Sequence, residues 1–275
     1  MKLRQMSRAE LDIVLHWAGE EGWNPGLDDA DAFYATDPGG FFVAEVAGAP
    51  VAAISVVNHS PGFAFLGLYI CRPDHRGQGI GYALWQHALA HAGARTIGLD
   101  GVPAQQENYR RSGFVLAAQN QRFSGVLSLG EGTALRPVTP DDLPALIDLE
   151  AAANGYRKEA FLSAWLRDTA TRQTYVLAGA EPPAGFVTLR QCLSGYKIGP
   201  LVAPGLETAT ALIAGAGRLT EGASVMIDVP SDQPALAAQC EAMGMAPCFS
   251  TARMYRGTAP GPGAECRTIA TLELG

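Results

Sequence analysis

The sequence predicts an α/β protein built from two copies of one fold. Three observations support this prediction: the chain length, the alternation of strand and helix patterns, and a repeat in constant register. At 275 residues and 28.9 kDa, the chain is longer than most single cores and suits two domains of about 140 residues. With 48% hydrophobic and 17% charged residues, it can fill two packed interiors, which excludes a disordered or collagen-like chain.

The repeat is visible at three anchors. The segment LRQMSRAEL at 3–11 recurs 132 residues later as LRPVTPDDL at 135–143, and each copy is typical of a short strand that ends at a helix N-cap. The other two anchors pair Pro73 with Pro204 and Gly113-Phe114 with Gly244-Met245. We therefore predict one domain at 1–130 and a second at 134–275, joined by a short linker near Gly130–Thr133.

Apolar spacing and turn residues predict the order of elements in the first copy. The expected strands are 2–6, 41–47, 51–58, 63–71, 95–100 and 114–127, and the expected helices are 8–19, 28–36, 79–92 and 104–112. The last strand is expected to close this unit, and the second copy should repeat the order. After a Pro/Gly linker at 258–263, we interpret residues 268–274 as a docking strand.

Charge and composition restrict the partners and the compartment. The net charge of −7 disfavours broad binding to nucleic acid through its phosphates. No apolar run approaches the roughly 20 residues that span a bilayer, so we expect no membrane partner. The five scattered cysteines have no CxxC spacing, which favours free thiols in a reducing compartment, and we predict a cytoplasmic protein.

The most informative segment is Arg76-Gly77-Gln78-Gly79-Ile80-Gly81, between a strand and a helix. Its three glycines let backbone N–H groups converge at a helix N-terminus, where the helix dipole also favours an anion. The spacing fits neither a P-loop nor GxGxxG, but it predicts a phosphate or pyrophosphate site. The alternative is a tight turn that binds no ligand.

This segment, with Leu68-Tyr-Ile-Cys-Arg-Pro73 before it, resembles motif A of the GNAT superfamily of N-acetyltransferases. Tyr109-Arg-Arg-Ser-Gly-Phe114 is similar to that superfamily's Tyr-x-x-x-Gly-Phe signature. The resemblance implies an α/β (α+β) fold of two tandem GNAT-like domains, each a mixed central sheet flanked by helices. It also implies acetyl-CoA as co-substrate, with the pyrophosphate on the amides of Arg76 to Tyr82. The pantetheine arm would pair with the backbone of Tyr69, Ile70 and Cys71.

The same resemblance places Tyr109 near the CoA sulfur. A phenol can donate a hydrogen bond or a proton to the departing thiolate. The alternative for Tyr109 is simple packing under the Gly113-Phe114 turn. The implied reaction is direct attack of a primary amine on the thioester in a ternary complex, with no metal, because His87 and His91 lack a third ligand nearby.

Two departures from the superfamily concern proton transfer. Val102 stands where an Asn is common, and the strand at 63–71 carries no carboxylate that could act as a general base. Asp100 and Glu107 are candidates for that role, although each also suits a structural or solvated position. These departures keep a second function open, that of an acyl-CoA sensor with little catalysis.

The acceptor wall is expected in the first helical region, where Trp23, Asn24 and Asp29 would suit a cationic amine. The alternative is that this region supplies core and capping residues. The acceptor can be a small molecule or a lysine amine, and the sequence leaves a homodimer open.

The second copy is expected not to bind CoA. At an offset of 131, Arg76 maps to Glu207 and Gly79 to Thr210, so a carboxylate and a branched side chain replace the cation and the glycine. Tyr109 maps to Cys240. The second domain is therefore predicted to be degenerate and to complete the acceptor pocket of the first, or else only to stabilise it.

Overall fold

The computed structural model describes residues 1–128, 134–179 and 182–275. The N-terminal half holds β1 (Lys2–Gln5), β2 (Phe41–Val46), β3 (Ala49–Asn58), β4 (Phe63–Cys71), β5 (Thr96–Gly101) and β6 (Val115–Gly125), with α1 (Arg8–Glu20), α2 (Asp29–Thr36), α3 (Ile80–Leu89) and α4 (Gln106–Arg111). The C-terminal half holds β7 (Leu135–Pro137), β8 (Arg172–Leu177), β9 (Phe186–Gln191), β10 (Tyr196–Ala203), β11 (Val225–Pro230), β12 (Ala246–Arg256) and β13 (Cys266–Arg267), with α5 (Leu143–Asn154), α6 (Glu159–Trp165), α7 (Leu206–Arg218) and α8 (Pro234–Ala242). The expected order of strands and helices is confirmed in both halves.

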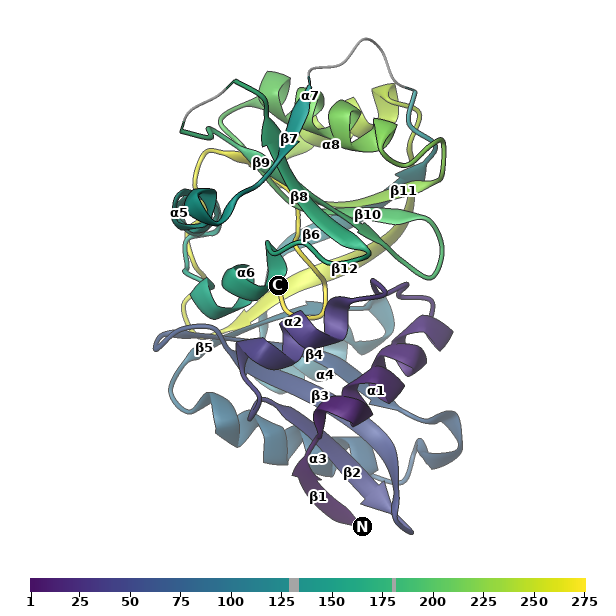
Figure 1. Cartoon of the computed structure of the whole chain (residues 1–275). Helices are drawn as coiled ribbons and strands as arrows, with labels where there is room; N and C mark the ends of the chain where they lie inside the picture. The colour runs from purple at the N-terminus through teal and green to yellow at the C-terminus, as the bar shows by residue number, and fades with distance from the viewer. Residues whose placement is uncertain (129–133, 180–181) are drawn as a thin grey trace.

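All thirteen strands join one mixed sheet in the order β1-β2-β3-β4-β5-β12-β6-β11-β10-β9-β8-β7, with β13 beside β10 (Figure 1). Most pairs are antiparallel, but β4 runs parallel to β5, and β10 to β11. The α/β fold with a mixed central sheet flanked by helices is therefore confirmed. The linker predicted at 130–133 lies outside the described residues, so the domain boundaries stay a prediction.

The expectation that the strand near 114–127 closes the first unit is wrong. Instead, β6 pairs with β11 of the second half, and β12 of the second half pairs with β5 of the first. The two exchanged strands also pair with each other, from Ala246 opposite Ser124 to Tyr255 opposite Val115. Each half therefore completes the sheet of the other, which no pattern local to one strand could reveal.

A buried ion pair fastens each exchanged strand to the half that receives it. Arg253 of β12 donates to both carboxylate oxygens of Asp100 on β5, each at 2.7 Å. Arg122 of β6 does the same to Asp228 on β11, each at 2.8 Å. Burial opposes ionisation of Asp228, but the guanidinium of Arg122 outweighs it and lowers the pKa of Asp228. A two-bond fork of this kind selects one register of pairing.

The helices pack on the sheet and enclose three hydrophobic cores with it. The α1–α2 side of the first half and the α5–α6 side of the second share one core, where Phe33 stacks on Trp165 with ring centroids 5.8 Å apart. The core beneath α3 consists of residues of the first half together with Ala252 and Met254 of β12. The core beneath α7 and α8 consists mostly of residues of the second half and includes Phe123 of β6. The halves are thus joined through a shared interior as well as through the sheet.

The segment after β13 is buried between the halves, but it is not the strand expected at 268–274. Strand pairing is confined to Cys266 and Arg267, which lie opposite Ala203 and Val202 of β10. From there the main-chain N–H of Thr268 donates to Leu201 of β10 at 3.0 Å, and that of Ile269 donates to Asp228 of β11 at 2.9 Å. We call residues 266–275 the C-terminal tail.

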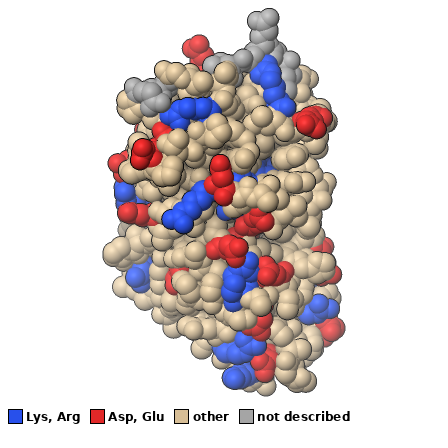
Figure 2. All heavy atoms as spheres, viewed as in Figure 1, with Lys and Arg blue, Asp and Glu red and all other residues tan. Residues whose placement is uncertain are grey.

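Surface and thiol features bear on the predicted compartment. Acidic and basic side chains are interspersed on the face in Figure 2, and most of that face carries neither. All five cysteines are free thiols. No helix among the described residues is long and apolar enough to cross a bilayer. A cytoplasmic location stays a prediction.

Candidate active site

The site begins where β4 and β5 separate. Their parallel pairing ends at Leu66 opposite Leu99, while β4 stays paired with β3 through Cys71. The register with β3 shifts between Gly67 and Ile70, and Leu68 within this bulge has φ 47°. The bulge and the separation leave the β5 side of residues 68–71 without a partner strand. This free edge is where the pantetheine arm is expected.

The glycine-rich turn lies directly after this edge. Gly77 and Gly79 have φ 74° and 77°, a conformation that favours glycine, and Gly79 is the N-cap of α3. Among the described residues, no main-chain carbonyl accepts from the N–H groups of residues 77–82 outside the α3 ladder. A Cβ added at Gly81 would lie 2.8 Å from the hydroxyl of Tyr69. A Cβ added at Gly77 or Gly79 would meet no atom within 4 Å. The turn therefore has both the free donors and, beside these two glycines, the open space that a pyrophosphate needs.

Arg76 lies at the turn with its guanidinium already engaged. Its Nε donates to the main-chain oxygen of Cys71 at 2.8 Å, and its Nη2 contacts the carboxylate of Glu21 at the end of α1. Both partners are acceptors, so the guanidinium is held over the groove between α1 and the turn. An incoming phosphate would compete with Glu21 for this cation.

These segments enclose an outer groove with a cavity volume of about 480 Å³. Of the residues expected to hold CoA, those lining it are Tyr69, Ile70, Cys71, Arg76, Gly77, Gly79, Ile80, Gly81 and Tyr82. Gln78 is not among them, and its side chain donates to the main-chain oxygen of Asp74 at 3.1 Å. The chain therefore offers a fit for an acyl-CoA, while binding itself stays a prediction.

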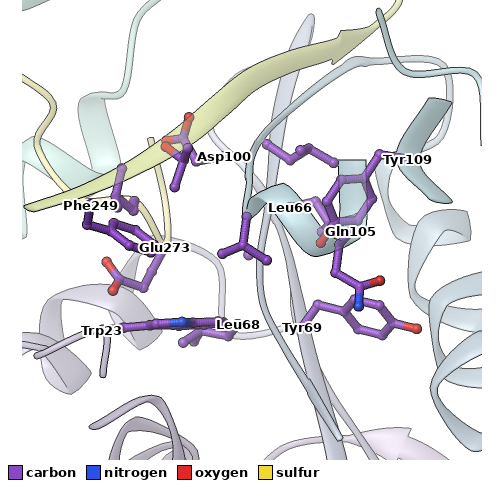
Figure 3. Close-up of a pocket in the computed structure, with 14 residues that line it drawn as sticks. Trp23, Leu66, Leu68, Tyr69, Asp100, Gln105, Tyr109, Phe249 and Glu273 are labelled. Carbon is purple, nitrogen blue, oxygen red and sulfur yellow. The ribbon is translucent and has the colours of Figure 1, made fainter. Parts of the chain in front are cut away.

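An inner cavity of about 60 Å³ lies beyond the groove, and Trp23, Tyr69, Val102 and Gln105 line both. In Figure 3, Trp23, Glu273 and Phe249 lie on one side with Leu68 beside Trp23, Tyr69, Gln105 and Tyr109 lie on the other, and Leu66 lies between them. Phe249 and Thr251 belong to β12, and Leu272 and Glu273 to the C-terminal tail. The second half therefore forms part of this cavity, while its role in an acceptor pocket stays a prediction.

Tyr109 reaches the inner cavity from α4. Its ring stacks on Trp85 with centroids 5.5 Å apart and meets the edge of Phe114 at 6.4 Å. No hydrogen-bond partner is present for its hydroxyl among the described residues. Burial, followed by the neighbouring Tyr69, raises the pKa of Tyr109, so the phenol keeps its proton at neutral pH. Packing and a donor role are therefore compatible in this one side chain.

The three residues expected to bind the acceptor have different surroundings. Trp23 lines the inner cavity and the groove. The side chain of Asn24 instead donates to Ser194 O at 2.8 Å and accepts from Ser194 N at 3.0 Å, which ties it to the second half. Asp29 is 1% exposed and accepts from Arg190 at 2.6 Å. Neither Asn24 nor Asp29 lines a cavity described here, so we no longer assign them to the acceptor.

Three carboxylates can be compared as proton acceptors. Glu107 lies on the outer surface of α4, 61% exposed and 3.4 Å from Arg110 and Arg111. Asp100 lines the inner cavity but is held by Arg253 and Asn120, and burial raises its pKa against the effect of Arg253. Glu273 lines the cavity from the C-terminal tail. The described residues contain no cluster of three or more potential metal ligands.

The second half lacks the turn, although the residue-by-residue mapping predicted for it is wrong. Eight residues, 72–79, separate β4 from α3, whereas only 204–205 separate β10 from α7. Glu207 and Thr210 thus lie within α7. Gly205 is the N-cap of α7 as Gly79 is of α3, and neither residue of this short connection is equivalent to Arg76. The mapping of Tyr109 to Cys240 is right, because the two residues make the same main-chain hydrogen bond. The carbonyl of Tyr109 accepts from Phe114 N–H at 3.0 Å, and that of Cys240 accepts from Met245 N–H at 3.1 Å.

Sequence reasoning missed every cavity residue that the second half contributes. These are Phe249, Thr251, Leu272 and Glu273. One signal was present, since Arg122 and Arg253 repeat at the same 131-residue offset as Pro73 with Pro204 and Gly113 with Gly244. That pair marks equivalent strands, but it does not say that the strands exchange.

Comparisons with known proteins agree with this geometry. Residues 9–114 match the acetyltransferase (GNAT) family, and residues 146–267 match an acetyltransferase (GNAT) domain. The chain is 34% identical to holothin acyltransferase of Pseudoalteromonas sp. (strain SANK 73390) over 273 residues, which cover 98% of this chain and 92% of that one. The chain therefore belongs to the GNAT acetyltransferase family, as a tandem member with two GNAT domains.

Solved structures show the same fold at low identity. A putative acetyltransferase from Pyrococcus horikoshii has a TM-score of 0.84 at 18% identity, covering 100% of this chain and 95% of its own. A tandem GNAT protein from the clavulanic acid biosynthesis pathway has a TM-score of 0.61 at 18% identity, covering 95% and 99%. These likenesses support the tandem fold, whereas the acceptor has to be inferred from the site.

Proposed function

We propose that this acyltransferase transfers an acetyl group from acetyl-CoA to a primary amine of a small molecule in a ternary complex. The observation that carries the proposal is the connection between the outer groove, which fits a nucleotide thioester, and a separate inner cavity. A thioester in the groove and an amine in the cavity would meet beside the β4 bulge. Positioning two reactants in this way removes much of the entropic barrier to their reaction.

Acetyl-CoA supplies an activated acyl group, and the chain supplies position and protons. The turn at 76–82 would hold the pyrophosphate, and the free edge of β4 would hold the pantetheine arm. Main-chain N–H groups near Ile70 would stabilise negative charge on the carbonyl oxygen. Tyr109, which keeps its proton, would donate a hydrogen bond to the departing sulfur.

The cavity supports a short acyl group and a small acceptor. Its volume is about 60 Å³, against about 480 Å³ for the outer groove. It is closed by β12 and the C-terminal tail as well as by β4 and β5, which disfavours a bulky acceptor. The relative that acts on holothin makes this compound the first acceptor to try.

The test is turnover by the purified full-length chain with acetyl-CoA, holothin and a panel of apolar primary amines and lysine peptides. We expect CoA release together with a mass increase of one acetyl group on a small amine. Preference for a lysine peptide would contradict the small-molecule acceptor. Binding of acetyl-CoA without turnover of any amine would instead favour an acyl-CoA sensor.

A further inference from the structure

The C-terminal tail follows a fixed path from the second half into the site of the first. In the second half, β10 and β11 separate after Ile198 opposite Ile227, just as β4 and β5 separate after Leu66 opposite Leu99. Thr268 and Ile269 of the tail fill this second opening through their bonds to Leu201 and Asp228. The opening equivalent to the pantetheine edge is thus occupied by the chain itself.

The far end of the tail is fastened to both halves. The ring Nε2 of His59 lies 2.7 Å from the main-chain oxygen of Leu274, and Lys158 Nζ donates to that of Gly275 at 2.6 Å. The main chain of Glu273 lies against β4, since a Cβ added at Gly67 would be 1.9 Å from its oxygen. Glycine at position 67 is therefore required for the tail to reach the bulge.

These restraints bring the Glu273 side chain into the inner cavity. Glu273 is 3% exposed and lies between Phe249 and Trp23 (Figure 3). The hydroxyl of Thr271 donates to its Oε2, and the Glu273 main-chain N–H donates to that hydroxyl at 3.0 Å. The carboxylate is held in one orientation by its own segment.

No cation closes an ion pair with this carboxylate. Among the described residues, none of the salt bridges includes Glu273, although Arg122, Arg190 and Lys197 all interact with it electrostatically. Arg122 is bound to Asp228 and Arg190 to Asp29. Lys197 donates to the main-chain oxygen of Trp23 at 2.8 Å. Each of these three cations is thus bonded to another group, which leaves the carboxylate of Glu273 open to a ligand cation.

We propose that Glu273 binds the ammonium group of the acceptor and accepts its proton, as the base that β4 lacks. This inference rests on the proposed function. Glu273 takes one proton from the ammonium, and the freed electron pair forms the carbon–nitrogen bond at the thioester carbonyl. The carbon–sulfur bond breaks, and its electron pair leaves on the CoA sulfur. Tyr109 gives its proton to the sulfur, and the nitrogen then gives a second proton to the Tyr109 oxygen, which restores the phenol. Glu273 releases the proton that it accepted to solvent.

The experiment compares Glu273→Gln, Glu273→Ala and wild-type full-length protein with acetyl-CoA and two probes, holothin and phenethylamine. Glu265→Gln is the matched control, because Glu265 immediately precedes the tail and lines neither cavity, so the variant removes a nearby carboxylate outside the site. We expect kcat/KM to fall about 10²–10⁴-fold in both Glu273 variants. The Kd of acetyl-CoA should stay within about twofold of wild type in all three variants, and added formate should restore part of the activity of Glu273→Ala.

The outcomes separate this inference from the proposed function. If wild-type protein acetylates neither probe nor any panel amine, the proposed function fails, and the role of Glu273 fails with it. If wild type is active and Glu273→Gln keeps its kcat/KM, only the role of Glu273 is overturned. Loss of activity without formate rescue, or with equally weakened acetyl-CoA binding, would show that Glu273 merely supports the fold.

Discussion

Single side chains at this site combine packing with chemistry. Tyr109 is the clearest example, because its ring packs in the core beneath α3 and the residue also lines the inner cavity. Arg76 is similar, since Glu21 and Cys71 hold it where an anion would bind. At each position, a substitution that keeps the packing but removes the polar group measures the chemical role of that group by itself.

The first prediction concerns Tyr109→Phe. The stacking on Trp85 should persist because only the hydroxyl is removed, so we expect the fold and the Kd of acetyl-CoA to change little. If the hydroxyl assists the departing thiolate, kcat should fall about 10²–10⁴-fold. Steady-state kinetics and calorimetric titration measure the two effects. Tyr34→Phe is the control, because Tyr34 packs on Phe41 away from both cavities. Full kcat in Tyr109→Phe would make Tyr109 a packing residue only.

The second prediction concerns acid stability. Burial, followed by the charge of Lys158, lowers the pKa of His59 to about 3 from a usual value near 6.5. The unfolded chain then binds more protons at this group, so stability should be lost as the pH falls from about 6.5 towards 3. This group can contribute up to about 1.4 kcal/mol per pH unit over that range.

Urea unfolding of wild type and His59→Gln between pH 7 and pH 4.5 measures this contribution. The glutamine amide can still donate to Leu274 but does not titrate, so its free energy of unfolding should depend less on pH. If the free energy of unfolding changes equally with pH in the two proteins, groups other than His59 determine the loss of stability at acid pH.

At the scale of elements, the two halves differ in the length of the connection between a strand and the helix that follows it. The eight residues between β4 and α3 make a turn with free amides, whereas the two residues between β10 and α7 leave no room for one. The second half compensates with its own tail, which bonds to β10 and β11 at the equivalent opening. The same opening in the sheet is thus free in the first half and occupied by the chain itself in the second.

The third prediction concerns Gly79→Val. Gly79 has φ 77°, a backbone conformation that valine adopts only with strain, and a Cβ added there would meet no atom within 4 Å. Valine would therefore distort the glycine-rich turn and obstruct its main-chain N–H groups without clashing with the core. We expect acetyl-CoA binding to weaken at least about 100-fold, with a folded protein. Gly205→Val is the matched control, because Gly205 caps α7 in extended backbone and also faces open space.

Calorimetric titration should give one acetyl-CoA site per chain in wild type and in Gly205→Val, and no measurable site in Gly79→Val. Two sites per chain, or unchanged affinity in Gly79→Val, would contradict the assignment of the turn.

At the scale of the whole molecule, the exchange of β6 and β12 makes the halves dependent on one another. Without the second half, β5 loses one of its two neighbours, β12, and β6 loses both of its neighbours in the sheet. Asp100 would lose Arg253, and the inner cavity would lose the side formed by β12 and the tail. Exposed strand edges of this length favour self-association.

The fourth prediction is that residues 1–128 alone do not form a folded monomer, whereas co-expression with residues 134–275 yields a 1:1 complex that binds acetyl-CoA. Size-exclusion chromatography with light scattering and calorimetry of the complex test this. A monomeric 1–128 fragment with the affinity of the full chain would show that the exchange is not required for the fold.

The sequence by itself determined the order of elements, the repeat and the glycine-rich turn. These are readable because periodicity, N-caps and a short run of glycines express local backbone preferences. The bounds of β4 match the expectation at both ends, and the capping acids Glu10 and Asp142 accept from Ser7 and Thr139 as the repeat implied.

Only the tertiary structure decided which strand completes which half, and therefore which residues meet at the cavity. β6 and β12 have similar patterns, so either could pair with β5, and the choice depends on contacts such as Arg253 with Asp100. Glu273 has no local signal at all, because its position follows from the bonds of the tail at both ends. Asn24 and Asp29 were misassigned for the same reason, since their partners Ser194 and Arg190 lie more than a hundred residues away.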